Sequence, residues 1–518
     1  MMRNASRRAL CGLLALCLLL TCSACSDSAV IDTPSVSATL PPAAARYEAP
    51  VGDGDMTYVA SLPLYLPSRD GKRLIARLTD VPLDHSAPAA RDLVQALLTA
   101  PADDSVLSLG RGEVSLQGYS TQPVELSAGV CTVNLGSQAL ALESSSLYAV
   151  AHALASTLAA AGDIRAVNLL VADQAVSYDV AGNLPSGSVS ARPGEELAAL
   201  WDALDARRTP LGQDPATVPL SATATLYFPL EGGQGFMPET RNLTFSGQTP
   251  QQLALGLLSA LSAGPQYLSP AMDMPALTEL LTREPEVSEL PEGGRLITLV
   301  FDEALAQWIS EVGMEPSCLC ASLVWTLTTF IPSVGAVRMI IGSTMTTLLQ
   351  SEVMGHLNFE NGLMRRRHFR DGLKEQLQVY LRSGSRLTGV TRVVNAQDAL
   401  NPRVMLTQLI RTPTAAELDE GLASPLPEGL DETDILGVSA EEDTLLINLS
   451  PRFETLLRRQ PELEQVACYA MLVTLCENLG YSRARFYFTG QQRERLGGDL
   501  YWAGEFLLNR ALIDDNRG

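Results

Sequence analysis

A short phrase recurs three times along the 518-residue chain and constrains its fold more than any other feature. Each copy is an apolar strand, a polar or glycine-rich turn, and a second strand that ends near an arginine. The copies read LYLPSRDGKRLIAR (64–77), LYFPLEGGQGFMPETR (226–241) and VYLRSGSRLTGVTR (379–392). The corresponding residues in them are Tyr65, Tyr227 and Tyr380, and then Arg77, Arg241 and Arg392. Such internal repetition predicts that one structural unit is built several times.

The sequence after each phrase repeats as well. A proline, an apolar helix and a second proline come next, over 87–101, 249–265 and 401–413. Proline suits the first turn of a helix, where its missing N–H loses no bond, and a proline past the end stops the helix. Two β-rich runs around a turn follow, then a second apolar helix and a closing strand.

The second helices, which complete the predicted unit, also carry a recurring residue. The threonines near the ends of these helices are Thr157, Thr326 and Thr474. The order predicted for each unit is therefore β-β-α-β-β-α-β. A unit of about 110–130 residues is long enough to bury a core of its own.

This pattern resembles the GerMN domain, a family named from the GerM proteins of sporulation and spore germination. The phrases that carry the resemblance are LYFP, MPETR, LLSAL followed by GP, TLVFDEAL, LVWTLTTF and VGAVRMIIG. The middle copy, about 221–345, fits the pattern best. The first copy spans about 57–175. The third, about 375–492, is the most divergent, since Arg382 stands where the others have Pro67 and Pro229.

The resemblance implies an α+β fold of three tandem small domains. Each would have a mixed sheet packed on two helices, similar to the ring-building modules of secretion systems. The expected segments are a lipoprotein signal peptide (1–24), a flexible tether (25–56), a GerMN-like domain 1 (57–190), a linker with a helix near 194–208 (191–220), a domain 2 (221–372) and a domain 3 (373–518).

The N-terminal residues have the composition of an export signal. Three arginines precede an apolar run from Ala9 to Leu20, which is shorter than the roughly 20 residues that span a bilayer. The stretch CSAC then places small residues before Cys25, which resembles a bacterial lipoprotein signal with a diacylglycerol on the Cys25 sulfur. Cys22 is the alternative acceptor, and a plain secretory signal is the other interpretation. Residues 26–56 are rich in Ser, Thr, Pro and Ala and cannot bury enough apolar surface to fold.

Charge excludes one class of partner. The formal net charge is −21, and such a chain repels nucleic acid and anionic lipid head groups. Membrane attachment must therefore come from the lipid on Cys25. The one basic run, RRRHFR at 365–370, predicts a solvated face between domains, with a docking site for an acidic partner as the alternative.

The sequence offers no catalytic constellation. It has no nucleophile elbow, zinc-protease motif, P-loop or dinucleotide fingerprint. The four histidines share no metal-ligand spacing and are predicted to be structural or exposed: His85, His152, His356 and His368. The five cysteines beyond residue 25 are odd in number, which argues against a disulfide framework and predicts buried small side chains: Cys131, Cys318, Cys320, Cys468 and Cys476.

These observations predict a protein that is not an enzyme and has no cofactor, no metal site and no nucleic-acid partner. The resemblance implies a membrane-anchored scaffold outside the cytoplasm that binds other envelope proteins during sporulation or spore germination. The alternative is a ligand-binding envelope lipoprotein that accompanies a sensory system. Fold analogy alone cannot decide between them.

Overall fold

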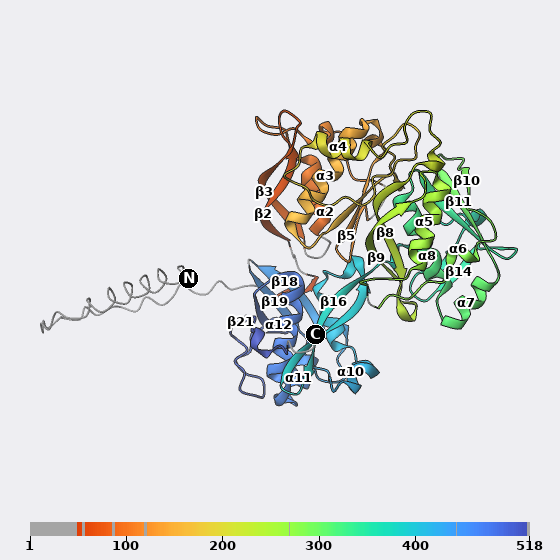
Figure 1. Ribbon diagram of the computed structural model, residues 1–518. Helices are drawn as coiled ribbons and strands as arrows, with labels where there is room; N and C mark the ends of the chain where they lie inside the picture. The colour runs from red at the N-terminus through yellow and green to blue at the C-terminus, as the bar shows by residue number, and fades with distance from the viewer. Residues whose placement is uncertain are drawn as a thin grey trace, which may run out of the picture. The chain divides into compact units, whose positions relative to one another are not determined.

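The computed structural model describes residues 49–53, 57–84, 89–118, 122–268, 270–441 and 443–514. These residues belong to one compact unit. One order of elements occurs three times along them, from orange through green to blue in Figure 1. The fold is α+β, as the sequence predicted.

Each repeat begins with a long antiparallel hairpin and a first helix. In the first repeat these elements are β2 (Thr57–Pro67), β3 (Leu74–Asp84) and α2 (Ala89–Thr99). In the second they are β8 (Leu220–Pro229), β9 (Phe236–Phe245) and α5 (Pro250–Ser262). In the third they are β16 (Lys374–Ser383), β17 (Arg386–Asn395) and α9 (Pro402–Ile410). Both α5 and α9 begin on the predicted proline.

A mixed sheet and a long buried helix complete each repeat. The sheet has four strands in the first two repeats and five in the third, where β1 (Gly52–Asp53) adds at its edge. The first sheet is β4 (Val124–Ser127), β5 (Val130–Leu135), β6 (Ala166–Val171) and β7 (Gln174–Ala175), with helix α3 (Ser144–Ala161). The second is β10 (Glu286–Glu289), β11 (Arg295–Phe301), β12 (Val334–Ile341) and β13 (Thr344–Met345), with α8 (Pro316–Phe330). The third is β18 (Ile435–Glu441), β19 (Thr444–Leu449), β20 (Arg483–Phe488) and β21 (Phe506–Leu507), with α12 (Glu464–Leu479).

In every sheet the two central strands are parallel and the outer strands are antiparallel to them. The long helix makes the crossover between the parallel strands, as parallel pairing requires. The opening hairpin, however, is a separate two-stranded sheet in each repeat. Each repeat therefore combines this hairpin with a mixed sheet.

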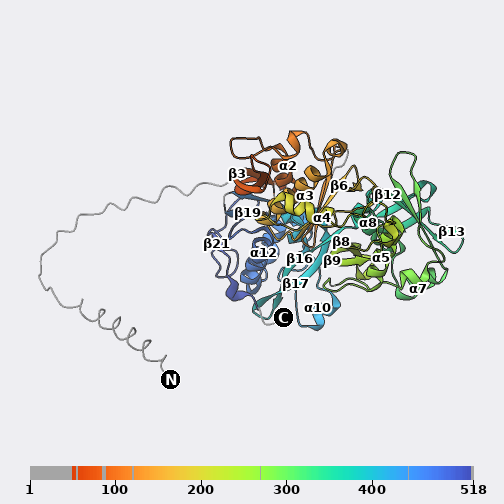
Figure 2. The same cartoon turned by 45° about the horizontal axis from the view of Figure 1, so that its top comes forward.

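A threonine of the long helix lies against one edge of each hairpin. The tyrosine N–H of the hairpin donates to the threonine hydroxyl: Tyr65 to Thr157 (2.9 Å), Tyr227 to Thr326 (3.0 Å) and Tyr380 to Thr474 (3.2 Å). A strand edge needs a partner for its backbone groups, and here a helix side chain supplies it. The three tyrosine–threonine pairs predicted to correspond do occupy equivalent positions. Both views place α12 beside β16 (Figures 1 and 2).

The predicted correspondence of the arginines holds for two of the three. Tyr227 pairs with Pro238 and Tyr380 with Gly389, and Arg241 and Arg392 each lie three residues beyond that pair. Arg77 lies only one residue beyond Ala76, the partner of Tyr65. The number of residues from tyrosine to arginine includes the hairpin loop, and the loop length differs between copies. The pairing register across the hairpin does not depend on that length. Each arginine still has an acidic partner: the pairs are Arg77–Asp103 (3.3 Å), Arg241–Glu239 (2.6 Å) and Arg392–Glu417 (2.8 Å).

Shorter elements connect or decorate the repeats. The predicted linker helix is α4 (Leu197–Asp205). The others are α6 (Leu277–Leu280), α7 (Ala304–Val312), α10 (Ala415–Asp419), α11 (Pro451–Arg458) and the hairpin β14 (Leu348–Ser351) with β15 (Gly355–Asn358). A 3₁₀ segment, η6 (Arg366–Gly372), leads into the third repeat.

The first two repeats share one hydrophobic core, whereas the third has a core of its own. The segment after β6 explains the fusion. Ser188 donates its N–H to the Thr223 carbonyl of the second repeat (2.8 Å), while Val189 bridges to Val167 of the first. Inside this junction the Ser188 hydroxyl bonds to Asn168 (2.7 Å). A core for each unit alone, as expected from length, is therefore correct only for the third repeat.

The end of the predicted tether is structured. Strand β1 (Gly52–Asp53) pairs in parallel with β18, and the Asn448 amide donates to the Pro50 carbonyl (2.8 Å). Main-chain pairing at the edge of a sheet recruits this segment, and such pairing needs no apolar side chains. Composition alone could not predict it.

A candidate binding cleft between the repeats

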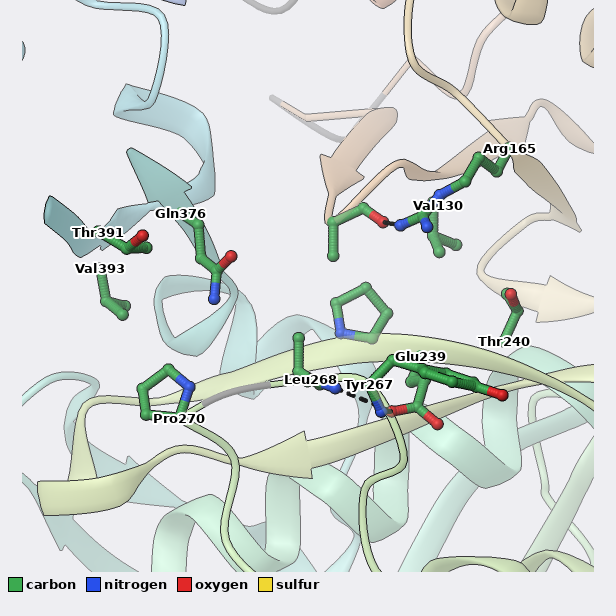
Figure 3. Close-up of a pocket in the computed structure, with 12 residues that line it drawn as sticks. Val130, Arg165, Glu239, Thr240, Tyr267, Leu268, Pro270, Gln376, Thr391 and Val393 are labelled. Atoms are coloured by element: carbon green, nitrogen blue, oxygen red, sulfur yellow. Dashed lines mark hydrogen bonds between the residues drawn. The ribbon is translucent and has the colours of Figure 1, made fainter. Parts of the chain in front are cut away.

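A cleft of about 600 Å³ lies where residues of all three repeats meet. Its lining residues are Ala128, Val130 and Arg165 of the first repeat, Pro238, Glu239, Thr240, Tyr267, Leu268 and Pro270 of the second, and Gln376, Thr391 and Val393 of the third. Figure 3 shows Gln376, Thr391 and Val393 together on one side of the space, with Arg165 and Val130 across from them. Its walls carry both apolar and polar groups.

The wall from the first repeat is a two-residue turn between β4 and β5. Ala128 and Gly129 both have positive φ, 48° and 72°. That conformation is unusual for alanine, so it needs support from its surroundings. The Ala128 N–H donates to the Glu375 carboxylate of the third repeat (2.8 Å), and Arg165 donates to the Ala128 carbonyl (2.7 Å). The turn is therefore held by Arg165 of its own repeat and by Glu375 of the third repeat.

The floor of the cleft is organised by Glu239. This buried carboxylate accepts from Arg241 Nε (2.6 Å) and from the N–H groups of Gln266 and Tyr267 (both 3.0 Å). Burial alone would raise the pKa of Glu239, but these hydrogen bonds hold it below its usual value. Glu239 thus stays ionised and fixes the loop that carries Tyr267. The Tyr267 side chain is 86% exposed at the cleft. Sequence analysis did not identify either residue.

The basic run is in part an internal ion pair. Arg366 is buried, and its Nη2 lies 2.6 Å from Oε2 of Glu125 in β4. Its guanidinium lies 3.5 Å from the Trp325 ring centroid, and its Nη1 donates to the Thr329 hydroxyl (2.6 Å). The predicted solvated face is therefore wrong for Arg366, and so is an open docking site. Its neighbour Arg367 does remain exposed.

The same segment joins the first and third repeats. Ser127 at the end of β4 donates its hydroxyl to the Lys374 carbonyl (2.5 Å). Burial lowers the pKa of Lys374 and raises the pKa of Glu375, so both side chains are strongly desolvated. Together with Arg366 these contacts cover the outer edge of β4 with the chain that enters the third repeat.

The histidines occupy separate places. His152 is buried in α3 with its ring 4.6 Å from that of Tyr148, and neither ring nitrogen has a partner among the described residues. Burial lowers its pKa to about 4. His356 is exposed on β15, and His368 accepts the Arg365 N–H at Nδ1 (3.1 Å). His85 lies outside the described residues.

The five cysteines are buried free thiols, as predicted: Cys131, Cys318, Cys320, Cys468 and Cys476. Burial raises the pKa of each, to about 11 for Cys318 and about 12 for Cys320 and Cys476. A thiol with a raised pKa is a poor nucleophile at neutral pH. Over the described residues no three potential ligands from His, Cys, Asp and Glu come close enough to hold a metal ion.

The proposed lipid acceptor Cys25, with the signal peptide around it, lies outside the described residues. Within the part of the chain that the structure describes, no helix is both long and apolar enough to cross a bilayer.

Comparison with known protein families gives a match for two of the three repeats. The model of the Germane family, described as "Sporulation and spore germination", matches residues 63–177 and 378–494. These matches fall on the first and third copies, so the prediction that the middle copy fits the family best is wrong. No curated protein sequence matches the chain.

Two solved structures are similar to it at low identity. The tandem GerMN domains of the sporulation protein GerM from Bacillus subtilis share 16% identity, over 60% of this chain and 99% of that one, with a TM-score of 0.22. A putative lipoprotein from Clostridium perfringens shares 18% identity, over 26% of this chain and 88% of that one, with a TM-score of 0.17. The family match rests on the sequence: over its first and third repeats this chain carries the Germane pattern of sporulation and spore germination, which confirms the resemblance predicted from its residues.

Proposed function

We propose that the chain is a scaffold outside the cytoplasm, anchored to the membrane by a lipid on Cys25, that binds other envelope proteins without catalysis. The process it serves is sporulation or spore germination, the description of the family that its first and third repeats match. The observation that carries the proposal is the cleft to which all three repeats contribute.

The walls of the cleft suit protein contact. Exposed tyrosine beside leucine and proline is typical of the centre of protein interfaces, because an aromatic ring buries much area and keeps a polar end. Here Tyr267 lies at the surface beside Leu268 and Pro270. The titratable group on the floor, Glu239, is already fully engaged with Arg241 and the loop.

Site-specific photo-crosslinking in the source cells tests this function. A photoreactive amino acid at Tyr267 should give a light-dependent crosslink to an envelope protein. The matched control is Leu211, which is also fully exposed and does not line the cleft. Identical crosslinks from both positions, or none from Tyr267, would contradict the proposal.

The ligand-sensing alternative draws on the size of the cleft, which falls within the range of small-molecule sites. It predicts that a small molecule raises the melting temperature of the purified protein and that Tyr267→Ala removes the shift. A scaffold should instead be stabilised only by a protein or peptide.

A further inference from the structure

We propose that the outer edge of β17 is a strand-addition site, where an extended segment of a partner protein pairs with the third repeat. This inference rests on the proposed function and says how the cleft would hold a partner.

The direction of the β17 backbone groups follows from two contacts. Arg382 on β16 exchanges both of its backbone bonds with Ala423, away from β17, and Arg382 is paired with Leu387. The Leu387 carbonyl likewise accepts the Asp514 N–H from outside the hairpin (2.8 Å). In an antiparallel pair, outward-facing residues alternate along each strand. Gly389, Thr391 and Val393 therefore direct their N–H and C=O groups outward.

These six backbone groups have no bonding partner among the described residues. They face open space, because a second cavity of about 610 Å³ is lined by every residue from Thr388 to Val393. Its opposite wall is formed by residues of α9, α10 and the segments beside them, Gln408, Arg411 and Glu417 among them. The edge therefore lies in a groove with free donors and acceptors, which is the geometry of strand addition.

The two cavities would receive opposite faces of an added strand. Thr391 and Val393 share a face with Gln376, and these three side chains line the first cleft. On the other face Arg392 reaches Glu417 of α10 (2.8 Å). Side chains of an added strand alternate in the same way, so one set enters the cleft beside Tyr267 and Pro270. The other set lies beside Arg411.

The chemistry of the two faces defines the occupant. The cleft face offers Leu268, Pro270 and Val393. On the helix face Arg411 bonds only to the Gln408 amide (3.1 Å) among the described residues and has no carboxylate partner there. The occupant is thus an extended segment of about five residues, with apolar side chains toward the cleft and a carboxylate at Arg411. The outward positions from 389 to 393 span about 13 Å at the rise of a strand, which is the length of a short extended segment.

The second repeat supplies a comparison within the same chain. The residue paired with Tyr380 is Gly389, whereas the residue paired with Tyr227 is Pro238. Proline has no N–H and blunts a strand edge, so β9 lacks a donor where β17 has one. This fold therefore tolerates proline there, and Gly389→Pro removes one donor at little cost to folding. The Cβ that such a change adds at Gly389 would meet Tyr380 at an ordinary 3.4 Å.

The experiment selects binders from a random nonapeptide display library on the full-length protein. Enriched peptides should alternate apolar and polar residues and carry an acid. Gly389→Pro should weaken their binding about tenfold, the effect of one lost buried hydrogen bond and its unpaired partner. Ala76→Pro is the matched control, because Ala76 pairs with Tyr65 in the first repeat and lines neither cavity. It should leave binding unchanged.

Hydrogen exchange provides a measurement that needs no variant. A bound peptide should slow exchange at the Gly389, Thr391 and Val393 amides of the unaltered protein, so strand addition is tested even if Gly389→Pro disrupts the hairpin. Strand addition would be overturned by peptides that no longer bind Tyr267→Ala, bind Gly389→Pro as well as the unaltered protein, and do not slow exchange at these amides. The cleft would then remain a binding site. A library that yields no binder overturns strand addition as well, and the crosslinks from Tyr267 then judge the scaffold by itself.

Discussion

Replacing Arg366 by methionine should destabilise the junction of the first two repeats far more than the same replacement of a surface arginine would. The change removes the cation that lies 2.6 Å from Glu125 and 3.5 Å from the centroid of the Trp325 ring. Arg366 keeps only 4% of its side chain exposed and Glu125 keeps 9%. The carboxylate would then be left buried beside Arg370 alone, whose Nε is 3.5 Å away.

The expected cost follows from that burial. Breaking a buried ion pair by removing one partner costs about 3–5 kcal/mol, because the remaining charge has lost its solvent and its counter-charge. Arg370, at 3.5 Å from Glu125, places the expected cost of Arg366→Met toward the lower end, about 3 kcal/mol. Glu125→Gln should cost a similar amount by leaving Arg366 unpaired. The double variant should cost less than the sum of the two, with a coupling of about 1–3 kcal/mol.

Urea unfolding followed by tryptophan fluorescence measures these differences, since Trp325 lies in the cluster itself. Arg495→Met is the control, because Arg495 pairs, among the described residues, with the fully exposed Asp499 alone at 3.5 Å and should change stability by less than about 0.5 kcal/mol. A cost below about 1 kcal/mol for Arg366→Met would refute the reasoning. It would mean that water screens the pair, as the sequence alone had suggested.

Three further changes test other parts of the structure. Thr326→Val leaves the Tyr227 N–H without its acceptor and should lower stability by about 1–3 kcal/mol, measured by thermal melting, whereas exposed Thr347→Val should not. His152 has a pKa of about 4 in the folded protein against an ordinary 6.5, so the unfolded chain takes up this proton first as pH falls. The free energy of unfolding should therefore fall as pH drops from about 6.5 to 4, and His152→Phe should reduce the change of the urea midpoint over that window. An unchanged pH dependence in His152→Phe would contradict this prediction. Cys25→Ala should release the protein from the membrane fraction or leave its signal uncleaved, as mass spectrometry of the N-terminus would reveal, and release by Cys22→Ala instead would move the lipid to Cys22.

The sequence predicted what each repeat needs for its own fold. Prolines mark the starts of α5 and α9 because a helix start tolerates a missing N–H. Thr157, Thr326 and Thr474 recur because each closes the edge of a hairpin. These requirements are local or lie within one unit, so they leave a periodic signal in the sequence.

Contacts between repeats left no such signal. Arg366 and Glu125 are 241 residues apart, and a run of arginines ordinarily indicates a solvated surface. The cleft is made from twelve residues of three repeats, none of which stands out by type or spacing. Beside the second cavity, Gly389 is a glycine inside a strand, and such a residue often marks close approach of another backbone. The pairing of Gly389 with Tyr380 depends on the hairpin register, and the arginine spacing predicted that register wrongly at Arg77.

Three copies of one unit in a single chain separate what the fold requires from what it leaves free. The tyrosine–threonine bond occurs in every repeat, on the hairpin edge that the long helix covers. On the opposite edge, the residue paired with that tyrosine is Ala76, Pro238 or Gly389. Folding sets no common demand there, because alanine, proline and glycine differ greatly in backbone freedom and proline lacks a donor. Differences in what the three repeats bind should therefore arise at this outer edge, and the third repeat, with its glycine and two adjoining cavities, is where an added strand fits.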